Sequence, residues 1–517
     1  MPRHHRRRLR TLNDQSNQET IQAALSPAQR DSQPPVTVVT MSIASFRDPD
    51  GFCFARDDRI LRAVSGKALA EIEPFLRSDT ARELITRRRL IPTRRLSESE
   101  RDGLASGEDF QLLARGRDVA AVFEHEKVEF VSYAYEWAPE MLHAAGRLTL
   151  DLAQSCLSEG YGLKDATPYN VLFQGGVPVF IDLLSFERRN PCDPIWKPHA
   201  QFCRTFLLPL LAYKLWGIHP ADVFTTRRDG LEPAEVYRLC GPLRKLLPPI
   251  LTLVSMPTWL SRKAAGKSLY RGRLLSDAGR ARFILEALFN RLRRTLETVR
   301  PGESRRSVWS SYMESHSYPE AGFKAKEEFV HGFLNQHKPG RVLDVGANTG
   351  HFSAQAARSG AKVVAIDYDL GCIGALWQRT QSEHLDILPL VIDLSRPSAR
   401  YGWRNRECSG FLDRAGRAFD AVLMLAVLHH LLVTERVPLE EVLELAAELT
   451  TRWLVIEFVP PQDELFQTLA RGRDHLHAGL TQSVFESACR RRFRLVRNQQ
   501  LPGTARWLYL LEKDSTL

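Results

Sequence analysis

Short apolar runs alternate with segments of helical spacing from residue 324 to the end of the chain. An amphipathic helix repeats apolar residues every three or four positions, whereas a strand buried on both faces is a continuous apolar run. Strict alternation of the two predicts a mostly parallel, doubly wound α/β sheet with helices on both faces. The predicted strands lie in 342-VLDVG-346, 363-VVAID-367, 419-FDAVLMLAVLHHLL-432, 453-WLVIEFV-459 and 506-RWLYLLEK-513.

The pattern between residues 44 and 190 is mixed and predicts an α+β region. Two short apolar segments flank Asp57 and Asp58 in 51-GFCFARDDRILRAV-64, which is typical of a hairpin. A strand is predicted at 128-VEFVSYAYEW-137, and apolar residues at helical spacing predict a helix over 139–159. The leucine- and arginine-rich stretch 195–300 is predicted to be mostly helical.

A chain of 517 residues exceeds one ordinary core, so we divide it into three parts. Residues 1–40 are polar and rich in Arg, Gln, Ser and Pro, which predicts a disordered basic tail. The N-terminal α+β region then covers 41–300, and Met41 is a candidate initiator. The α/β domain covers 301–517.

The net charge of +10 is spread along the chain and matches no nucleic-acid-binding motif, so a nucleic-acid partner is not expected. The eight cysteines are scattered without a Cys-x-x-Cys pair, which suits a reducing cytoplasm and disfavours a structural metal site. No apolar run reaches the length of a membrane span. The two longest, 205–217 and 246–257, are predicted to be buried helices or, as an alternative, surfaces that grip an apolar ligand.

The turn after the first predicted strand of the C-terminal domain indicates a cofactor pocket. In 344-DVGANTG-350, Gly346 and Gly350 allow a sharp strand-to-helix turn and close approach of a ligand. Asp367 ends the next strand, where a carboxylate accepts hydrogen bonds from both ribose hydroxyls. Asp344 would repel a pyrophosphate but attract an ammonium group, and a ligand with a ribose and an aminocarboxylate is S-adenosylmethionine. Another nucleotide-binding α/β domain is the alternative.

This segment resembles motif I of the class I S-adenosylmethionine-dependent methyltransferases, and the following segments come in the family's order. The resemblance covers about 190 residues and implies a Rossmann-like domain that uses S-adenosylmethionine. It implies that the cofactor is bound by Asp344, Gly346, Asn348, Gly350 and Asp367, and that Asp393, in 391-VID-393, contacts the adenine amino group.

A finer resemblance is to a family of long bacterial methyltransferases that includes rhizobial nodulation-type proteins. The segments 309-WSSYMESHSY-318, 424-MLAVLHHL-431 and 456-IEFVPPQD-463 carry it. The resemblance implies that the first segment covers the cofactor, with Trp309, Tyr312 and Tyr318 packed on it; plain helix packing is the alternative.

His429, His430 and Glu457 fall at the predicted carboxyl ends of strands, where open α/β sheets bind their ligands. We expect His429 or His430 to act as a general base, although histidines here can also be structural. No Asn/Asp-Pro-Pro-Tyr/Phe motif follows the fourth strand, which disfavours an adenine or glutamine amino group as acceptor. A small molecule or a protein side chain is expected instead.

The N-terminal half contains 163-LKDATPYNVLFQGGVPVFIDLLSFE-187, which has a kinase-like outline. Asp165 and Asn170 have the spacing of a kinase catalytic loop, and a Gly-Gly hairpin delivers Asp182, so the three could hold a metal. The segment is similar to the aminoglycoside-phosphotransferase-like branch of the kinase superfamily. It departs from it in lacking a glycine-rich phosphate loop and a clear strand-three lysine, for which Lys67 is the nearest candidate. A hairpin with capped turns is the alternative to a kinase-like fold.

Three functions therefore stand side by side: a methyltransferase, a bifunctional protein that also binds ATP and magnesium or phosphorylates a small molecule, and a regulatory scaffold that binds S-adenosylmethionine.

Overall fold

The computed structural model describes residues 42–45, 47–263, 274–302 and 318–514. The predicted basic tail, the candidate initiator Met41, and Trp309 and Tyr312 lie outside the described residues.

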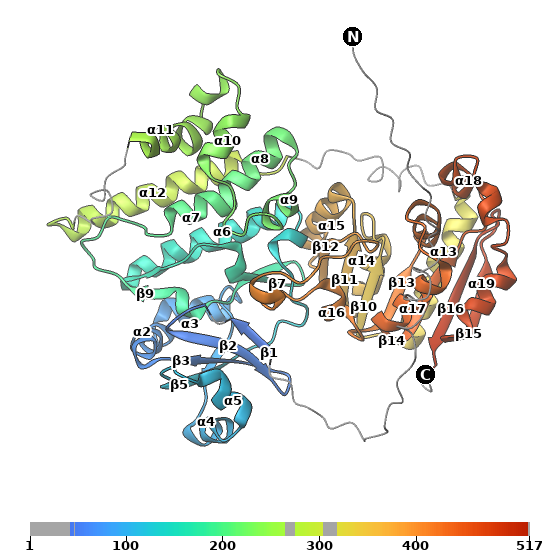
Figure 1. Cartoon of the computed structure of the whole chain (residues 1–517), viewed down its shortest axis with the longest axis horizontal. Coiled ribbons are helices and arrows are strands. Elements are labelled where there is room, and N and C mark those ends of the chain that lie inside the picture. The colour runs from blue at the N-terminus through green and yellow to red at the C-terminus, as the bar shows by residue number, and fades with distance from the viewer. Residues whose placement is uncertain (1–41, 46, 264–273, 303–317, 515–517) are drawn as a thin grey trace, which may run out of the picture. The chain divides into compact units, whose positions relative to one another are not determined.

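The C-terminal region is built on a seven-stranded sheet in the order β12-β11-β10-β13-β14-β16-β15 (Figure 1). The first five strands in this order are parallel, and β16 pairs antiparallel with both β14 and β15. This is the predicted Rossmann-like, mostly parallel sheet. The strand bounds are β10 Arg341–Val345, β11 Lys362–Asp367, β12 Ile387–Val391, β13 Phe419–Met424, β14 Thr450–Phe458, β15 Phe493–Gln500 and β16 Trp507–Lys513.

Helices pack against this sheet because its central strands are buried throughout. Helix α14 packs on β10 and β11, α15 packs on β11 and β12, and α17 packs on β13 and β14. The register aligns Val345 with Ile366 and with Met424, so these strands end at the same level. The helices are α13 Glu320–His337, α14 His351–Arg358, α15 Leu370–Glu383, α16 Phe411–Ala415, α17 Leu439–Leu449, α18 Glu464–Ala470 and α19 Gln482–Cys489.

The N-terminal region begins with an antiparallel sheet in the order β1-β2-β3-β5-β4. The predicted hairpin at 51–64 is confirmed, because β2 and β3 pair around the turn at Asp57 and Asp58, both at positive φ. Helices α2 (Gly66–Leu76) and α3 (Asp79–Thr86) connect β3 to β4, and α4 (Glu98–Ala105) and α5 (Glu108–Ala114) connect β4 to β5. The strands are β1 Ser42–Ser45, β2 Gly51–Arg56, β3 Arg59–Val64, β4 Thr93–Arg95 and β5 Ala121–His125.

The strand predicted at 128–137 is wrong. The strand of this region is β5, which ends at His125, and 134–136 form a short 3-10 turn. The aromatic residues that suggested a strand are buried by tertiary contacts instead: the Phe130 ring packs 5.8 Å from that of Phe419. These residues are apolar because tertiary contacts bury them. Their apolar pattern resembles that of a strand, although they do not pair with a neighbouring strand of the sheet.

The helix predicted at 139–159 is confirmed as α6 (Pro139–Ser155) with a 3-10 turn over 156–159. Gly160 ends it at φ 78, a conformation that favours glycine. Four short strands follow: β6 (Tyr161–Leu163) pairs with β9 (Phe186–Arg188), and β7 (Val171–Gln174) forms a hairpin with β8 (Val177–Phe180).

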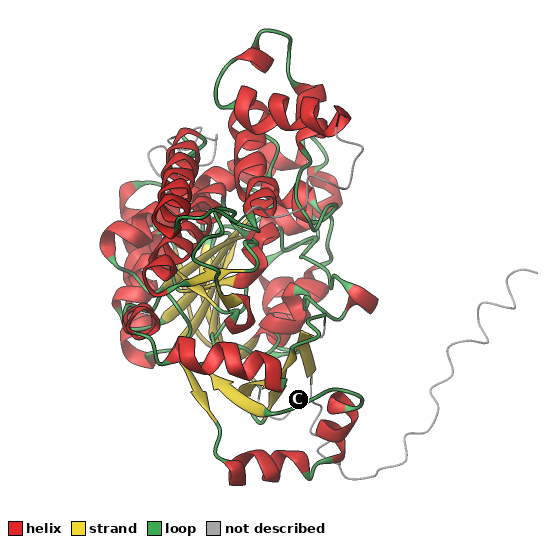
Figure 2. Cartoon of the chain, turned by 90° about the vertical axis from the view of Figure 1, so that its left-hand side faces the viewer, coloured by secondary structure: helices red, strands yellow, loops and turns green. Residues whose placement is uncertain are grey.

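Residues 199–263 and 274–302 are mostly helical, as predicted, and Figure 2 shows helices gathered at the top of the view. The main elements are α7 His199–Phe202, α8 Leu208–Trp216, α9 Pro220–Phe224, α10 Pro233–Leu239, α11 Met256–Lys263 and α12 Ala278–Thr298. The apolar run 205–217 is largely buried, as predicted, but the prediction for 246–257 is wrong in part, because Leu246, Leu247 and Met256 are exposed. No helix among the described residues is long and apolar enough to cross a membrane.

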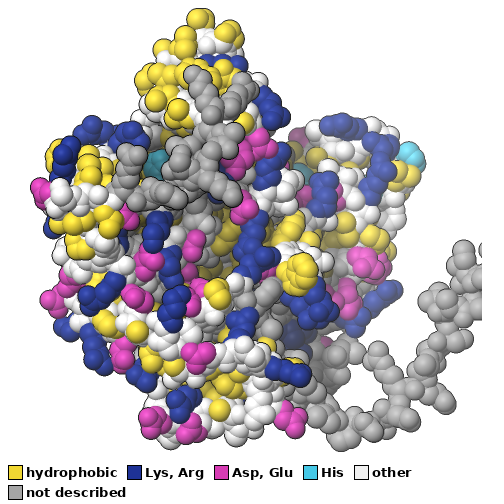
Figure 3. All heavy atoms as spheres, turned by 60° about the vertical axis from the view of Figure 1, so that its left-hand side comes forward, with side chains coloured by type: hydrophobic (Ala, Val, Ile, Leu, Met, Phe, Trp, Pro, Cys, Tyr) yellow, Lys and Arg dark blue, Asp and Glu magenta, His cyan; other side chains and the backbone are white. Residues whose placement is uncertain are grey.

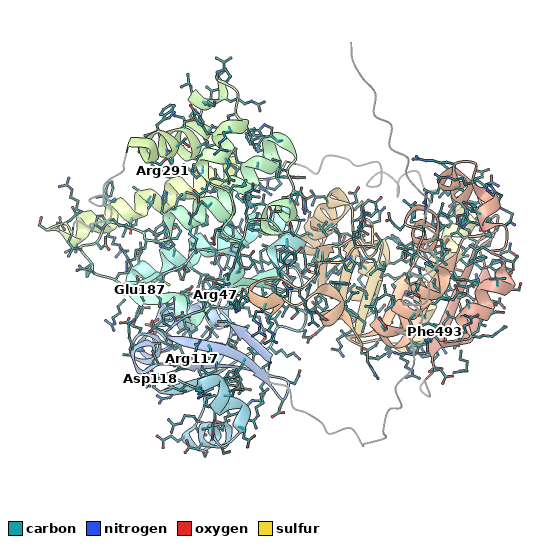
Figure 4. The ribbon with its side chains drawn as sticks, viewed as in Figure 1. Arg47, Arg117, Asp118, Glu187, Arg291 and Phe493 are labelled. Carbon is teal, nitrogen blue, oxygen red and sulfur yellow. The ribbon has the colours of Figure 1, made fainter. Side chains whose placement is uncertain are left out.

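Residues 41–517 form one unit, within which residues far apart in sequence make ion pairs. Arg414 donates to the buried Glu136 at 3.1 Å, and Arg47, labelled in Figure 4, donates to Glu407 at 2.9 Å. A buried ion pair stabilises only when both charges are present, because either one alone would be an uncompensated buried charge.

Candidate active site at the carboxyl end of the sheet

The turn between β10 and α14 is shaped by its glycines. Gly346 and Gly350 adopt φ 69 and φ 78, which side-chain-bearing residues rarely tolerate. A Cβ on Gly350 would lie 2.1 Å from Leu376 Cδ1, so α15 also requires glycine there. The Gly346 and Ala347 backbone amides donate to the Ile366 carbonyl at 2.9 and 3.0 Å. The turn is therefore fixed against the end of β11.

Asp367 is held at this turn by backbone amides. Its Oδ2 accepts a hydrogen bond from Asn348 N at 2.9 Å, and its Oδ1 accepts one from Asp369 N at 2.8 Å. Asn348 itself is at φ 51, a left-handed conformation that asparagine tolerates better than most residues. Burial raises the pKa of Asp367 to about 6. Each carboxylate oxygen keeps a lone pair for a ligand hydroxyl.

Asp344 lies deeper, at the end of β10. Its Oδ2 accepts a 2.6 Å hydrogen bond from Ser353 of α14, and both side chains are buried. Burial raises the pKa of Asp344 to about 7, with a smaller contribution from the charge of Asp367. A cation next to these two carboxyls would favour their ionised forms.

Asp393 follows β12 and is held mainly by its own loop. It accepts hydrogen bonds from Ser395 N at 2.9 Å and from Arg396 Nε at 3.1 Å. Burial alone would raise the pKa of Asp393, but the hydrogen bonds from Ser395 and Arg396 outweigh it and hold the pKa below its ordinary value.

His429 and His430 follow β13, after a backbone kink at Ala426, which has φ 56. His429 is only 1% exposed, and neither ring nitrogen has a hydrogen-bond partner among the described residues. Burial lowers the pKa of His429 well below its ordinary value, helped by the nearby charges of His430, Arg506 and Lys326. His430, which begins a π-helical turn (His430–Thr434), is half-buried, and burial lowers its pKa too. The two rings lie 4.4 Å apart.

Glu457, near the end of β14, is fully buried and already engaged. Its Oε1 accepts a 2.7 Å hydrogen bond from the Tyr318 hydroxyl, and its Oε2 pairs with Lys326 Nζ at 2.7 Å. Lys326 Nζ also donates to the Tyr318 hydroxyl at 3.2 Å. Burial lowers the pKa of Lys326, but the carboxylate of Glu457 opposes that shift.

A second buried pair lies beside the first. Arg506 donates to both carboxylate oxygens of Asp463, at 2.7 and 3.0 Å, and its guanidinium lies 4.4 Å from the centre of the Tyr318 ring. Two cations, two carboxylates and a tyrosine thus form one buried network, and the charges of its two cations act on His429.

Sequence reasoning missed Lys326, Asp463 and Arg506. The only signal was weak: Lys326 lies three and four positions before Phe329 and Val330, on the buried face of α13. A lysine on an apolar helix face needs a partner, but the sequence does not say which residue supplies it.

A groove of about 460 Å³ is lined by residues that follow the two histidines in the sequence. The π-helical turn supplies Leu432 and Val433 to its wall and packs against α18. The other side includes Leu469, Leu480 and Val484, and the charged or polar lining residues are Arg436, Glu440, Arg473 and His477. Neither arginine has an acidic partner among the described residues.

The kinase-like residues of the N-terminal region are also brought together. Asp182 Oδ1 pairs with Arg62 Nη1 at 3.1 Å, and its Oδ2 accepts from Ser185 Oγ at 2.7 Å. Ser185 in turn accepts from Asn170 Nδ2 at 3.0 Å. Asp165 lies at the surface, where Gln201 donates to it at 3.3 Å; partial burial raises its pKa, and the charge of Asp182 adds to the shift. No group of three His, Cys, Asp or Glu suited to a metal occurs in the described part of the chain.

The cation on β3 is Arg62 and not Lys67. Lys67 is exposed and pairs with Asp50 at 3.2 Å. Arg62 is 6% exposed and donates from Nε to His125 on β5 at 3.1 Å, in addition to its pair with Asp182. The sequence does contain a basic residue at this position, the second arginine of RILRAV. Kinases carry a lysine there, so the family pattern points to Lys67 and not to Arg62.

The strand order, the glycine turn and the acid at the tip of β11 define a class I methyltransferase, whose methyl donor is S-adenosylmethionine. A family model described as "Methyltransferase domain" matches residues 318–477. The chain is 33% identical over 478 residues to "Nodulation protein NoeA" of Rhizobium meliloti (strain 1021), covering 91% of this chain and 95% of that protein. It belongs to the NoeA family.

Solved structures of methyltransferases also match the chain. The N-methyltransferase NodS from Bradyrhizobium japonicum WM9 is 15% identical, with 38% of this chain and 99% of NodS covered and a TM-score of 0.28. Magnesium protoporphyrin IX methyltransferase (ChlM) from Synechocystis PCC 6803 with bound SAH is 19% identical, with 44% and 94% covered and a TM-score of 0.29. The family assignment rests on NoeA and on the domain model.

Proposed function

We propose that the C-terminal domain methylates a hydroxyl group of a small-molecule acceptor and that His429 is the general base. The buried His429, whose ring nitrogens have no hydrogen-bond partner among the described residues, carries this proposal. An imidazole buried without a hydrogen bond is costly, and an acceptor hydroxyl would relieve that cost. A base must also be unprotonated, and the lowered pKa of His429 keeps its ring neutral.

S-adenosylmethionine supplies a methyl group already activated on a sulfonium. His429 accepts the hydroxyl proton as the acceptor oxygen gains the methyl group and the sulfur–methyl bond breaks. Glu457 is a positioning residue, because its carboxylate is occupied by Lys326 and Tyr318. His430 lies beside His429 and contributes to keeping it neutral.

The residues around the glycine turn suit the parts of the methyl donor. Asp367 has free lone pairs at the tip of β11 for the two ribose hydroxyls. Asp344 and Asp367 provide negative charge for the donor's ammonium and sulfonium groups. Asp393 lies two positions beyond Val391, the residue that pairs with Asp367, and would lie near the adenine.

We place the acceptor in the groove that begins at Leu432 and Val433. Its apolar wall suits an acceptor with an aliphatic or ring portion, and Arg436 and Arg473 suit an anionic or polar group on it. A small molecule fits a groove of about 460 Å³.

The test compares His429→Ala with His430→Ala using labelled S-adenosylmethionine and a cell extract. We expect His429→Ala to lose at least about 100-fold in label transfer to the small-molecule fraction, because general-base catalysis contributes that much. Donor affinity by calorimetry should change little, and His430→Ala should keep most activity. Transfer by His429→Ala at the wild-type rate would overturn the assignment of the base.

For the N-terminal region we propose a kinase-like fold that serves acceptor recognition or regulation without phosphoryl transfer. Support comes from the sheet order β1-β2-β3-β5-β4, followed by α6 and a loop that brings Asp165, Asn170 and Asp182 together. Asp182 is already neutralised by Arg62, which leaves it a poor ligand for magnesium.

Thermal unfolding of the full chain with ATP and magnesium tests this second proposal. We expect no shift in Tm. A shift of several degrees that disappears in Asp182→Ala would instead establish a working nucleotide site.

All eight cysteines are free, which suits a reducing compartment, and we place the enzyme in the cytoplasm.

A further inference from the structure

The segment from α10 to α11 exposes an unusual set of large apolar side chains. Leu243 is 80% exposed, and Leu246, Leu247 and Leu260 are each about 60% exposed. Leu239, Met256 and Trp259 add to the same segment. Isolated exposed leucines are ordinary, but seven large apolar residues within 22 positions form a patch that needs an explanation. We call these seven residues the apolar patch.

The segment that carries the apolar patch is anchored in the hydrophobic core by its buried residues. Val236, Ile250 and Val254 belong to the main hydrophobic core, and they alternate along the chain with the exposed residues. The segment is therefore anchored on one side and presents its other apolar side chains outward. Figure 3 shows apolar side chains gathered at the top of the molecule in that view, the end that α10 and α11 occupy.

The charges around the apolar patch are mainly positive. Between residues 236 and 263 the sequence has five Lys or Arg residues (Arg238, Arg244, Lys245, Arg262 and Lys263) and no Asp or Glu. The two acids at the start of α10, Glu232 and Glu235, pair with Arg204 and Arg227 outside this segment. Lys245 Nζ lies 4.1 Å from the centre of the Tyr237 ring, and Trp259 Nε1 donates to the Tyr237 hydroxyl at 3.2 Å. Leucines, a Tyr–Trp pair and lysine or arginine are the residues that enter the boundary between lipid headgroups and acyl chains.

We propose that the apolar patch docks the enzyme on an anionic lipid surface, with the leucines inserted and Arg244 and Lys245 at the headgroup phosphates. The mainly positive charge favours this occupant over a second copy of the chain, because two such surfaces facing each other would repel. The inference does not rest on the proposed methyl transfer, since it concerns a different part of the chain.

Co-sedimentation of the full chain with vesicles tests the proposal. The vesicles contain phosphatidylcholine alone or a 7:3 mixture with phosphatidylglycerol. We expect binding to the anionic vesicles that weakens at high salt. Leu243→Asp/Leu247→Asp should reduce it at least about tenfold. Arg244→Glu/Lys245→Glu should remove the preference for anionic lipid, since basic residues at the surface are attracted to the negatively charged headgroups.

Leu112→Asp is the matched control, because Leu112 is 70% exposed but lies on α5. It should bind vesicles like the wild type. All variants should keep an unfolding midpoint close to that of the wild type, because the altered leucines and Arg244 are exposed and Lys245 is only partly buried. Absence of vesicle binding, or equal binding by Leu243→Asp/Leu247→Asp, would overturn the proposal. So would a wild-type dimer in size-exclusion chromatography that this double variant converts to monomer, because the apolar patch would then be a contact between copies.

Discussion

Two clusters of buried polar residues can be compared, one around Glu457 in the methyltransferase domain and one around Asp182 in the N-terminal region. In the N-terminal cluster, Arg62, Asp182, Ser185 and Asn170 each contact another member. In the C-terminal cluster the charges are paired too, but His429, on which the charges of Lys326 and Arg506 act, is buried and has no hydrogen bond to any described residue. A cluster in which every polar group has a partner stabilises the fold. A cluster with a buried polar group that lacks a partner is available to bind a ligand.

The backbone at the candidate site turns sharply. Gly346, Asn348, Gly350 and Ala426 are all at positive φ, and they flank the ends of β10 and β13. Positive φ by itself does not mark a site, because Asp57 and Asp58 adopt it in a hairpin turn and Lys338 and His384 adopt it where helices end.

The largest expected effect comes from breaking a charge pair in each cluster. Glu457→Ala leaves Lys326 buried and unpaired, and we expect a loss of about 3–5 kcal/mol in the free energy of unfolding. Asp182→Ala should cost only about 1–3 kcal/mol, since Arg62 keeps its hydrogen bond to His125. Urea unfolding measures both. Equal losses would remove the distinction between the two clusters.

Next in size is the glycine turn. Gly350→Ala combines a left-handed φ with a Cβ 2.1 Å from Leu376, and should cost about 2–4 kcal/mol in stability and weaken donor binding. Gly360→Ala is the matched control: its φ is 94, but nothing lies within 4 Å of the added Cβ. It should cost only about 1–2 kcal/mol and leave calorimetric affinity for the donor unchanged. A Gly350→Ala variant as stable as Gly360→Ala would contradict the close packing of α15.

Asp367→Ala should reduce affinity for S-adenosylmethionine by at least about 100-fold, or roughly 2.7 kcal/mol, because two hydrogen bonds to a carboxylate are lost. Calorimetry measures this directly. Asp182→Ala is the control and should bind the donor like the wild type. Unchanged affinity in Asp367→Ala would remove Asp367 from the cofactor site.

The pH dependence gives a smaller effect with a definite sign. Burial raises the pKa of Asp367 to about 6. In the proposed site, Asp367 binds the donor in its carboxylate form. Affinity for the donor should therefore fall about tenfold per pH unit below pH 6. The stability of the ligand-free protein should change in the opposite direction: the raised pKa favours the protonated fold, so this contribution is present below the unfolded pKa and is lost as pH rises through about 6. Affinity independent of pH between 5 and 7 would contradict this role.

The smallest effect is expected at Lys67. It is exposed, so Lys67→Ala should change stability by no more than about 0.5 kcal/mol. Arg62→Ala, at the buried position on β3, should cost several times more in urea unfolding. A larger loss of stability in Lys67→Ala than in Arg62→Ala would indicate that Lys67, and not Arg62, is the structurally important cation of this region.

The sequence by itself determined the C-terminal sheet and the position of the glycine turn. Both depend on local signals: continuous apolar strands such as 363-VVAID-367, and glycines where the chain must turn. It also brought Asp165, Asn170 and Asp182 into one hypothesis, because their spacing is local. The strand predicted at 128–137 failed because burial of Phe130 comes from residues almost 300 positions away.

Only the tertiary structure decided what each polar residue does. Lys326 and Glu457 are 131 positions apart, and Arg62 and Asp182 are 120 apart, so no spacing rule connects them. Glu457 had been expected among the catalytic residues, yet Lys326 and Tyr318 occupy its carboxylate, while the His429 ring has no hydrogen-bond partner in the part of the chain that the structure describes. A side chain's reactivity depends on its burial and its neighbours, and those are set by how distant segments pack together.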